Sequence, residues 1–267
     1  MPALPSGLMA GRLEKRLRRL DGPLRVLLLA GTSEARQIAY ALARNPRIVT
    51  MASLANAGRR PIPLGVPTRI GGWGDRATFR AWLVENAITG IIDATHPFAN
   101  GISARAAEVA DELGIDYLQF LRPAWRPEEG DEWVFLNSEE DAAAHIPENV
   151  RVFLATGRMR LEGFSGLRSQ DLLCRLLDAP SHPFPLPNGR FVVHRPPFTI
   201  DHEAAVLGTL GVDWLVARNS GGSGSRAKID AARRLGIPVA MIRRPPQPEA
   251  ARAQTLSEVL AWIGRRA

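Results

Sequence analysis

The stretch RVLLLAGTSEAR, residues 25–36, joins a short apolar run to the beginning of a helical pattern. The apolar run has the length of a buried strand and is far shorter than the roughly 20 residues that cross a bilayer. Residues 31–33 predict a tight turn, and residues 34–44 predict a helix. A strand, a turn and a helix in this order predict the opening unit of a parallel α/β sheet.

The same alternation of short apolar runs and helical periods continues along the chain. The predicted strands are 25–30, 48–54, 68–70, 90–94, 116–121, 133–136, 150–155, 171–177, 214–217 and 238–242. The predicted helices are 34–44, 75–86, 99–113, 200–210, 226–235 and 255–263, with a further helix capped at 138. This pattern predicts an α/β protein of two Rossmann-like parallel-sheet domains facing a central cleft.

The predicted domain boundary lies near residues 136–138. Residues 1–24 are interpreted as a basic N-terminal extension, since neither a secretory signal nor a clean transit peptide fits them. Residues 25–137 are the first Rossmann-like domain, and residues 138–267 are a second α/β domain.

Composition excludes several classes of function. The single cysteine, Cys174, excludes a disulfide framework, and five scattered histidines make a metal site improbable. Part of the net charge of +7 lies in the extension, and no basic stripe with interleaved aromatics predicts nucleic-acid binding. The positive charge fits an anionic small molecule instead. We expect a cytoplasmic monomer that binds no metal, nucleic acid or membrane.

Ligands of parallel α/β sheets bind beyond the carboxyl ends of the strands. After the first strand come Gly31, Thr32, Ser33, Glu34, Ala35 and Arg36. Backbone N–H groups at this helix start suit a pyrophosphate. The second and third glycines of G-x-G-x-x-G are missing, so an ordinary capped turn is an open alternative.

Two further loops of the first domain suit a dinucleotide. The second strand leads into Ser53 and Arg59, where an NAD site would carry a carboxylate. A hydroxyl and a guanidinium suit the 2′-phosphate of NADPH, although a solvated basic loop is the alternative. Gly71 and Gly72 follow the third strand and imply a close approach to a ligand or to a neighbouring helix.

The segment DATHPFA, residues 93–99, places an acid, a hydroxyl and an imidazole after the fourth strand. His96 is a candidate proton donor or substrate-orienting group because imidazole titrates near neutrality. Asp93 is a second candidate proton donor. The alternative is that Asp93 and Thr95 cap the next helix, which Pro97 would open.

The second domain offers several anion-binding groups. These are Arg158, Arg195, Ser220, Gly222, Ser223 and Lys228. The glycine- and serine-rich loop 218–228 presents N–H and hydroxyl donors at a helix start, although a flexible linker is the alternative. Lys228 is one of only two lysines in an arginine-rich chain, so either a specific role or chance explains it.

These loops, in this order, resemble the precorrin-6A reductase family. The matching segments are 27–36, 53–55, 71–74, 93–99, 156–158, 218–222 and 228–229. The resemblance covers residues 25–263 and implies NADPH-dependent reduction of precorrin-6A to precorrin-6B in cobalamin biosynthesis. It departs from the family pattern at Gly58, which falls later than expected after Ser53.

The resemblance implies a role for each domain. Residues 25–137 would bind NADPH, and residues 138–267 would bind the carboxylates of the tetrapyrrole. The proton that accompanies hydride would come from His96, Asp93 or water. A cobalt-precorrin-6A reductase using NADH, a sugar-nucleotide transferase and a nucleotide-sensing module are the alternatives.

Overall fold

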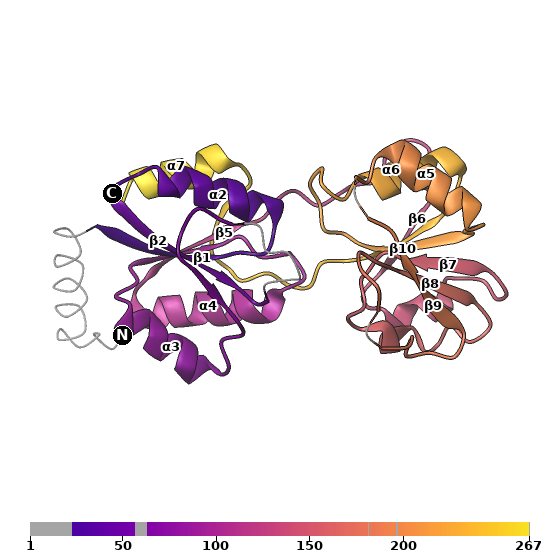
Figure 1. Ribbon diagram of the computed structural model, residues 1–267, viewed down its shortest axis with the longest axis horizontal. Coiled ribbons are helices and arrows are strands. Elements are labelled where there is room, and N and C mark those ends of the chain that lie inside the picture. Colours follow the sequence, from indigo (N-terminus) through magenta and orange to yellow (C-terminus); the bar gives the residue numbers. More distant parts are fainter. Residues whose placement is uncertain (1–22, 57–62, 181, 196, 267) are drawn as a thin grey trace, which may run out of the picture. The chain divides into compact units, whose positions relative to one another are not determined.

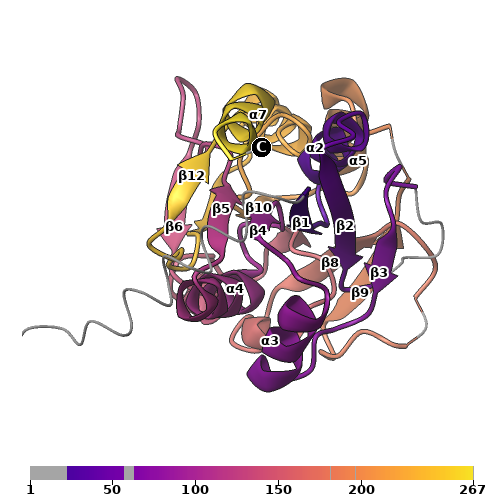
Figure 2. The same cartoon turned by 90° about the vertical axis from the view of Figure 1, so that its left-hand side faces the viewer.

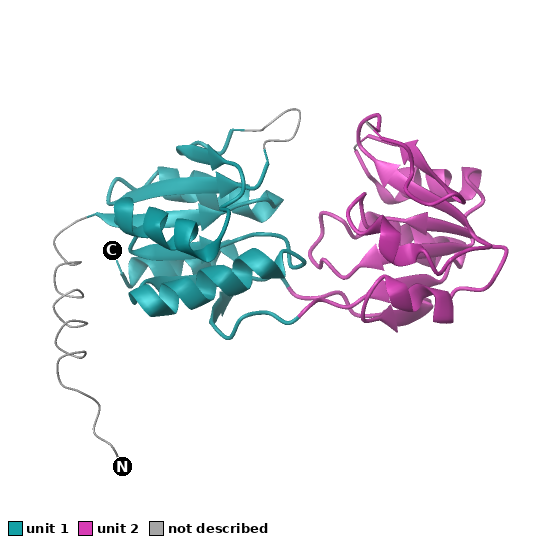
Figure 3. Ribbon diagram, turned by 90° about the horizontal axis from the view of Figure 1, so that it is seen from below, with its two compact units in different colours: residues 1–122, 246–267 teal, residues 123–245 magenta. Residues whose placement is uncertain are grey.

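The computed structural model describes residues 23–56, 63–180, 182–195 and 197–266. The chain divides into two compact units, coloured separately in Figure 3. Unit 1 comprises the chain up to Arg122 together with the segment from Pro246 onward, and unit 2 comprises Pro123–Pro245. Nearly all of the extension predicted at 1–24 lies outside the described residues, as does Arg59.

Unit 1 contains a six-stranded parallel sheet with the order β12-β5-β4-β1-β2-β3. Its strands are β1 (Leu24–Leu29), β2 (Ile48–Leu54), β3 (Thr68–Ile70), β4 (Gly90–Asp93), β5 (Asp116–Phe120) and β12 (Ala251–Ala253). The strand order reverses between β1 and β4, which is the switch point where Rossmann folds bind dinucleotides.

Helices cover both faces of this sheet (Figures 1 and 2). α2 (Ser33–Ala43) and α7 (Leu256–Gly264) lie on one face, and α3 (Arg76–Glu85) and α4 (Asn100–Leu113) lie on the other. β1 is buried between the two layers because Val26 and Leu28 pack toward α2 and α7, whereas Leu27 and Leu29 pack toward α3 and α4. This two-sided burial explains why β1 is a continuous apolar run.

Unit 2 contains a second six-stranded parallel sheet, with the order β6-β11-β10-β7-β8-β9. Its strands are β6 (Trp133–Leu136), β7 (Arg151–Leu154), β8 (Asp171–Leu176), β9 (Gly189–Val193), β10 (Trp214–Arg218) and β11 (Val239–Ile242). The order reverses between β7 and β10. Two α-helices, α5 (Ile200–Thr209) and α6 (Ala227–Leu235), pack together, and only a short 3-10 helix, η2 (Leu161–Phe164), connects β7 to β8.

The unit boundary differs from the one predicted from the sequence. β6 pairs with β11 and therefore belongs to unit 2, although its sequence precedes the predicted boundary. β12 pairs with β5, and α7 packs on α2, so the end of the chain returns to unit 1. Each sheet thus obtains its sixth strand through a pairing between segments far apart in sequence.

Local predictions also needed correction. The helix predicted from Ser138 is a five-residue 3-10 helix, η1 (Glu140–Ala144), without a side-chain cap. Strands β9 and β12 were not predicted, since one follows a proline-rich loop and the other has three residues. The capping box predicted for α7 is present, because Thr255 accepts from the Glu258 N–H and the Glu258 carboxylate accepts from the Thr255 N–H.

Candidate functional site

In unit 1, the loops after β1 and β4 meet at the carboxyl edge of the sheet. The Thr32 hydroxyl accepts a hydrogen bond from the Ala35 N–H (3.1 Å) and donates one to the Ala94 carbonyl (2.8 Å). Thr32 therefore caps α2 and ties the two loops together across the switch point. Gly31 has a φ of +146°, and a Cβ there would meet no atom within 4 Å. The glycine is required by backbone conformation and leaves space beside the start of α2.

Two charged residues lie in the first turn of α2. Glu34 accepts hydrogen bonds from Ser33 (3.0 Å) and Arg122 (2.8 Å). Partial burial opposes ionisation, but backbone hydrogen bonding and Arg122 together lower the pKa of Glu34. Arg122 thus neutralises an acid at a helix start that otherwise favours anions. The Arg36 Nε is buried and has no acceptor among the described residues.

A buried carboxylate anchors the loop after β4. Asp93 is 1 % exposed. Its Oδ1 accepts from the N–H (3.0 Å) and hydroxyl (2.7 Å) of Thr95, and its Oδ2 accepts from the Tyr117 hydroxyl (2.8 Å). Burial and the charge of Asp93 raise the pKa of Tyr117, so this phenol stays a donor. The buried Asp93 carboxylate therefore shapes the loop through Thr95 and Tyr117.

His96 is half-buried on the same loop. Its Nδ1 accepts a long hydrogen bond of 3.3 Å from the Phe98 N–H. An accepting Nδ1 places the proton of a neutral imidazole on Nε2. Pro97 does not open the next helix as predicted, because α4 begins at Asn100 with Ala99 as its N-cap and no side-chain cap. Asp93 and Thr95 accordingly do not cap α4.

The ends of β2 and β3 lie farther along the same edge. Ser53 is buried at the end of β2, next to Leu29 of β1 in register. The turn after β3 is held by Arg69, which donates to the carbonyls of Gly71 and Gly72 and stacks on Trp73 at 3.9 Å. A Cβ at either glycine would meet nothing within 4 Å, so no neighbouring helix demands a glycine there.

In unit 2, the predicted anion-binding arginines lie at the carboxyl edge of the second sheet. Arg158 is exposed and follows β7 after Thr156 and Gly157. Arg195 follows β9, is 74 % exposed, and contacts Asp178 at 3.6 Å and the Leu177 carbonyl at 3.4 Å. Both side chains are exposed to solvent.

The loop after β10 carries the other predicted residues. Ser220 is buried, and Ser223 is exposed. The Gly222 carbonyl accepts a hydrogen bond of 2.7 Å from the Trp125 indole. The flexible linker considered from the sequence is thus wrong for residues 219–222, which are held by side chains from other segments.

Lys228 lies in the first turn of α6 and is only 8 % exposed. Its Nζ donates to the Ser225 carbonyl (2.8 Å) and lies 5.7 Å from the centre of the Trp125 ring. Burial and the positive charge of Arg175 lower the pKa of Lys228 to about 8, and Glu203 opposes this change. Arg175 and Glu203 themselves form a buried ion pair at 2.7 Å.

Comparison with known proteins identifies the family to which the chain belongs. A family model described as Precorrin-6x reductase CbiJ/CobK matches residues 25–264. The chain belongs to this family. A protein of Rhodococcus erythropolis named Precorrin-6A reductase is 40 % identical over 90 % of this chain and 97 % of its own length. A relative of the same name from Rhodobacter capsulatus is 38 % identical over 90 % of this chain and 95 % of its own.

A solved structure supports the family at the level of the fold. The structure titled CobK precorrin-6A reductase matches with a TM-score of 0.85 and 37 % sequence identity. The match covers 91 % of this chain and 97 % of the other. More distant relatives named Cobalt-precorrin-6A reductase include one from Priestia megaterium, 30 % identical over 82 % of this chain and 90 % of its own length.

Several residues that shape the loops after β4 and β10 were not predicted from the sequence. Tyr117 supports Asp93, whereas Trp125 and Arg244 hold the loop after β10. Asn219 lies in the matched segment 218–222, and its amide makes two hydrogen bonds to the Trp125 backbone (2.8 and 3.0 Å). No local pattern signals these contacts, because the partners lie 24 to 97 residues apart.

Proposed function

We propose that the protein reduces one double bond of precorrin-6A with NADPH and forms precorrin-6B in cobalamin biosynthesis. The observation that carries this proposal is the similarity over 90 % of the chain to relatives named Precorrin-6A reductase, at 38 and 40 % identity. Relatives named Cobalt-precorrin-6A reductase are only 26 to 30 % identical, which favours the cobalt-free substrate.

Unit 1 is the better candidate for the cofactor. At its switch point, α2 follows β1 directly and presents a helix start, whereas β7 of unit 2 leads only into the four-residue η2. Pyrophosphate recognition in Rossmann folds depends on such a helix start. Residues 31–36, 71–72 and Thr95 would surround the cofactor, which supplies hydride when bound. The open space beside Gly31 fits this role.

The preference for NADPH over NADH is proposed from the end of β2. No carboxylate stands at Ser53–Asn56 to accept a hydrogen bond from a ribose 2′-hydroxyl. Within the described part of the chain the buried Arg36 Nε has no acceptor, and a 2′-phosphate would pair with the Arg36 guanidinium. Arg59 is proposed as a second. An Arg36→Ala variant is expected to lose affinity for NADPH more than for NADH.

Unit 2 is the proposed site for the tetrapyrrole carboxylates. Arg158, Arg195, Ser220, Gly222, Ser223 and Lys228 are the candidate binding residues. Exposed apolar side chains accompany them at the carboxyl ends of β7, β8 and β9 and at the start of α5. They are Met159, Leu177, Val193 and Ile200. Apolar surface rimmed by arginines suits a flat ring that carries carboxylates at its edge.

The proton that accompanies hydride is assigned to His96 or to water. Asp93 is 1 % exposed and occupied by Thr95 and Tyr117, so we now propose it as a positioning residue. His96 is half-buried on the loop after β4 and is proposed to orient the substrate or a water molecule. A His96→Ala variant that kept the wild-type pH profile of kcat would assign the proton to water.

The decisive experiment mixes the purified protein with NADPH and precorrin-6A without oxygen and follows cofactor absorbance and the pigment spectrum together. Equal amounts of NADPH consumed and pigment converted would support the proposal. Turnover of only the cobalt-containing analogue, or only with NADH, would establish the alternative reductase. Failure to bind NADPH, combined with binding of a nucleotide sugar, would contradict the reductase proposal. A cytoplasmic monomer remains our prediction, and sedimentation tests the monomer.

Among the described residues, no helix is both long enough and apolar enough to span a bilayer.

A further inference from the structure

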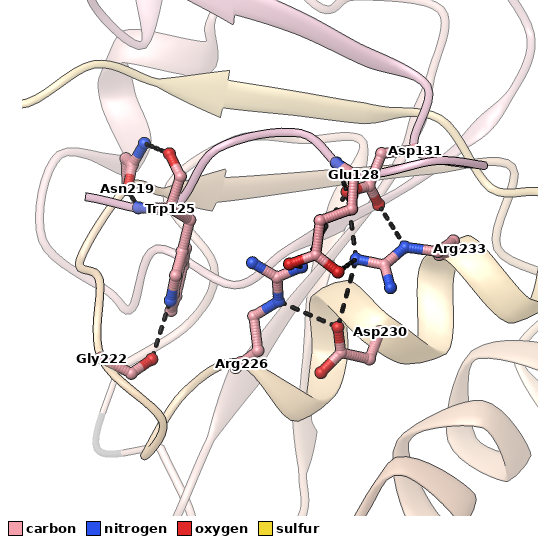
Figure 4. Close-up of polar contacts among 8 residues, drawn as sticks. All are labelled: Trp125, Glu128, Asp131, Asn219, Gly222, Arg226, Asp230 and Arg233. Atoms are coloured by element: carbon pink, nitrogen blue, oxygen red, sulfur yellow. Dashed lines mark hydrogen bonds and ion pairs between the residues drawn. The ribbon is translucent and has the colours of Figure 1, made fainter. Parts of the chain in front are cut away.

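The segment after Arg122 is fastened to the loop that follows β10 (Figure 4). The buried Asn219 amide bonds both the N–H and the carbonyl of Trp125, as a neighbouring strand would. The Trp125 indole Nε1 then donates to the Gly222 carbonyl (2.7 Å). A single side chain therefore fixes the position of the Gly222 peptide.

A second group of contacts fixes the same segment on α6. The Asp131 carboxylate is 1 % exposed and accepts from Arg233 at 3.0 and 3.1 Å. Glu128 accepts from Arg226 at 2.9 Å, and Arg226 also bonds Asp230 at 2.9 Å (Figure 4). Burial opposes the charge of Asp131, but Arg233 and the Glu128 N–H together lower its pKa, so the Asp131 carboxylate stays ionised. Trp125 is thus held on a fixed segment.

These contacts point the carbonyl groups of the loop after β10 toward Trp125 and Arg244. Arg244 donates to the carbonyls of Asn219 (2.8 Å) and Ser220 (3.1 Å), while Trp125 takes that of Gly222. The N–H groups of Gly221, Gly222 and Ser223 donate to no acceptor within the described residues. Successive N–H groups left free beside residues of positive φ form the concave arrangement that binds anions. Gly221 and Gly222 have φ values of +67° and +70°.

The backbone approach at Gly221 shows how closely the segments fit. A Cβ at Gly221 would lie 2.1 Å from the Pro123 carbonyl oxygen and 2.3 Å from the Arg244 Nη2. The Pro123 oxygen belongs to backbone and cannot rotate away. Only glycine therefore allows Pro123, Arg244 and the loop to occupy their positions together.

We infer that Trp125 is a positioning residue for substrate binding: its indole N–H holds the Gly222 carbonyl inward so that the N–H groups of residues 221–223 face a substrate carboxylate. This inference rests on the proposed function, in which the loop binds the tetrapyrrole. Asn219 and Arg244 complete the same support. Lys228, beside the Trp125 ring, adds a cation to the anion site.

The test compares two Trp→Phe variants of the full-length protein. Trp125→Phe keeps an aromatic ring but removes the donor to Gly222. Trp133→Phe is the matched control, because the Trp133 Nε1 is buried in the same unit and donates to nothing among the described residues. The measured quantities are KM for precorrin-6A, kcat and the Kd of NADPH, with Lys228→Met tested in parallel.

Trp125→Phe is expected to raise KM for precorrin-6A about five- to tenfold, the size of one hydrogen bond. The kcat at saturating substrate and the Kd of NADPH are expected to stay near wild type, and Trp133→Phe is expected to change none of these values. A purely structural role would instead lower the active fraction, and thus kcat, without changing KM.

The other outcomes separate the inference from the function on which it rests. If Lys228→Met raised KM while Trp125→Phe and Trp133→Phe behaved alike, the loop would still bind substrate, but the positioning role of Trp125 would be overturned. If neither Lys228→Met nor Trp125→Phe changed KM, the loop would take no part in substrate binding. Both the proposed role of this loop in binding the tetrapyrrole and the positioning role of Trp125 would then be wrong.

Discussion

At the scale of single residues, the buried carboxylate of Asp93 depends on Tyr117. Tyr117→Phe removes the hydrogen bond to Oδ2 and leaves part of a buried charge unsatisfied. We expect a loss of about 1–3 kcal/mol in the free energy of unfolding, measured by urea titration. Because Thr95 bonds the same carboxylate, NADPH affinity is expected to fall as well.

Tyr40 provides the control for this prediction. It is the only other tyrosine, and its exposed hydroxyl donates to the Pro63 carbonyl. Tyr40→Phe is expected to change stability by less than about 0.5 kcal/mol. Equal losses for the two variants would contradict the special role given to the Tyr117–Asp93 bond.

Lys228 gives the protein a measurable pH dependence. Its pKa is lowered from 10.5 to about 8 by burial and by Arg175. Below pH 8 the folded chain carries the full cost of a buried ammonium. Between pH 8 and 10.5 the folded chain releases this proton and the unfolded chain retains it, so the free energy of unfolding rises with pH. The check is urea denaturation across this range in wild type and Lys228→Met.

The difference between these two proteins isolates the lysine. Cys174 acts in the opposite direction, because burial raises its pKa from 9.0 to about 12 and stability falls as the unfolded thiol ionises first. Cys174 contributes to both proteins and cancels, while Arg175 and Glu203 also remain in both. Parallel stability curves for wild type and Lys228→Met would show that Lys228 keeps its ordinary pKa.

At the scale of elements, sequence periodicity identifies local structure well and contacts poorly. The strands β1, β4 and β10 were predicted because each is an apolar run buried on both faces. The positions of the loops at the switch points follow from where those strands end. The hydrogen bond from Trp125 to Gly222 could not be predicted, since it joins residues 97 positions apart and depends on a turn with two positive φ angles.

The loop after β10 supplies a sharp prediction at this scale. In Gly221→Ala, the alanine must adopt a positive φ and also displace the Pro123 carbonyl. We therefore expect the free energy of unfolding to fall by about 3 kcal/mol or more. Gly236 has nearly the same φ, +65°, but a Cβ there would meet nothing within 4 Å. Gly236→Ala should therefore lose only about 1–2 kcal/mol. Thermal unfolding distinguishes the two, and equal losses would mean that crowding at Gly221 is unimportant.

At the scale of the whole molecule, the division into units does not follow the order of the chain, because unit 1 contains both the segment up to Arg122 and the segment from Pro246 onward. The sequence predicts two parallel-sheet units because strands and helices alternate throughout. It does not show that β6 completes the second sheet or that β12 completes the first. Such pairings are decided by which sheet edge remains open, and a three-residue strand such as β12 has too few residues to show periodicity.

This arrangement predicts that unit 1 requires the end of the chain. A chain ending at Pro245 lacks β12 and α7, and with them the buried side chains of Val259, Trp262 and Ile263. Burial of each contributes about 1.5–3 kcal/mol, and the sum is comparable with the whole stability of a domain. The truncated protein is therefore expected to lose NADPH binding, measured by titration calorimetry, although no removed residue is proposed to touch the cofactor.

A chain ending at Gly264 is the matched control. It keeps β12 and α7 and loses the ion pair between Arg266 and Asp116, which is partly exposed and worth about 1 kcal/mol or less. Its NADPH affinity is expected to equal that of the full chain. If the chain ending at Pro245 also bound NADPH normally, β1 to β5 would form a competent unit alone, and the returning strand would serve some purpose other than completing the cofactor domain.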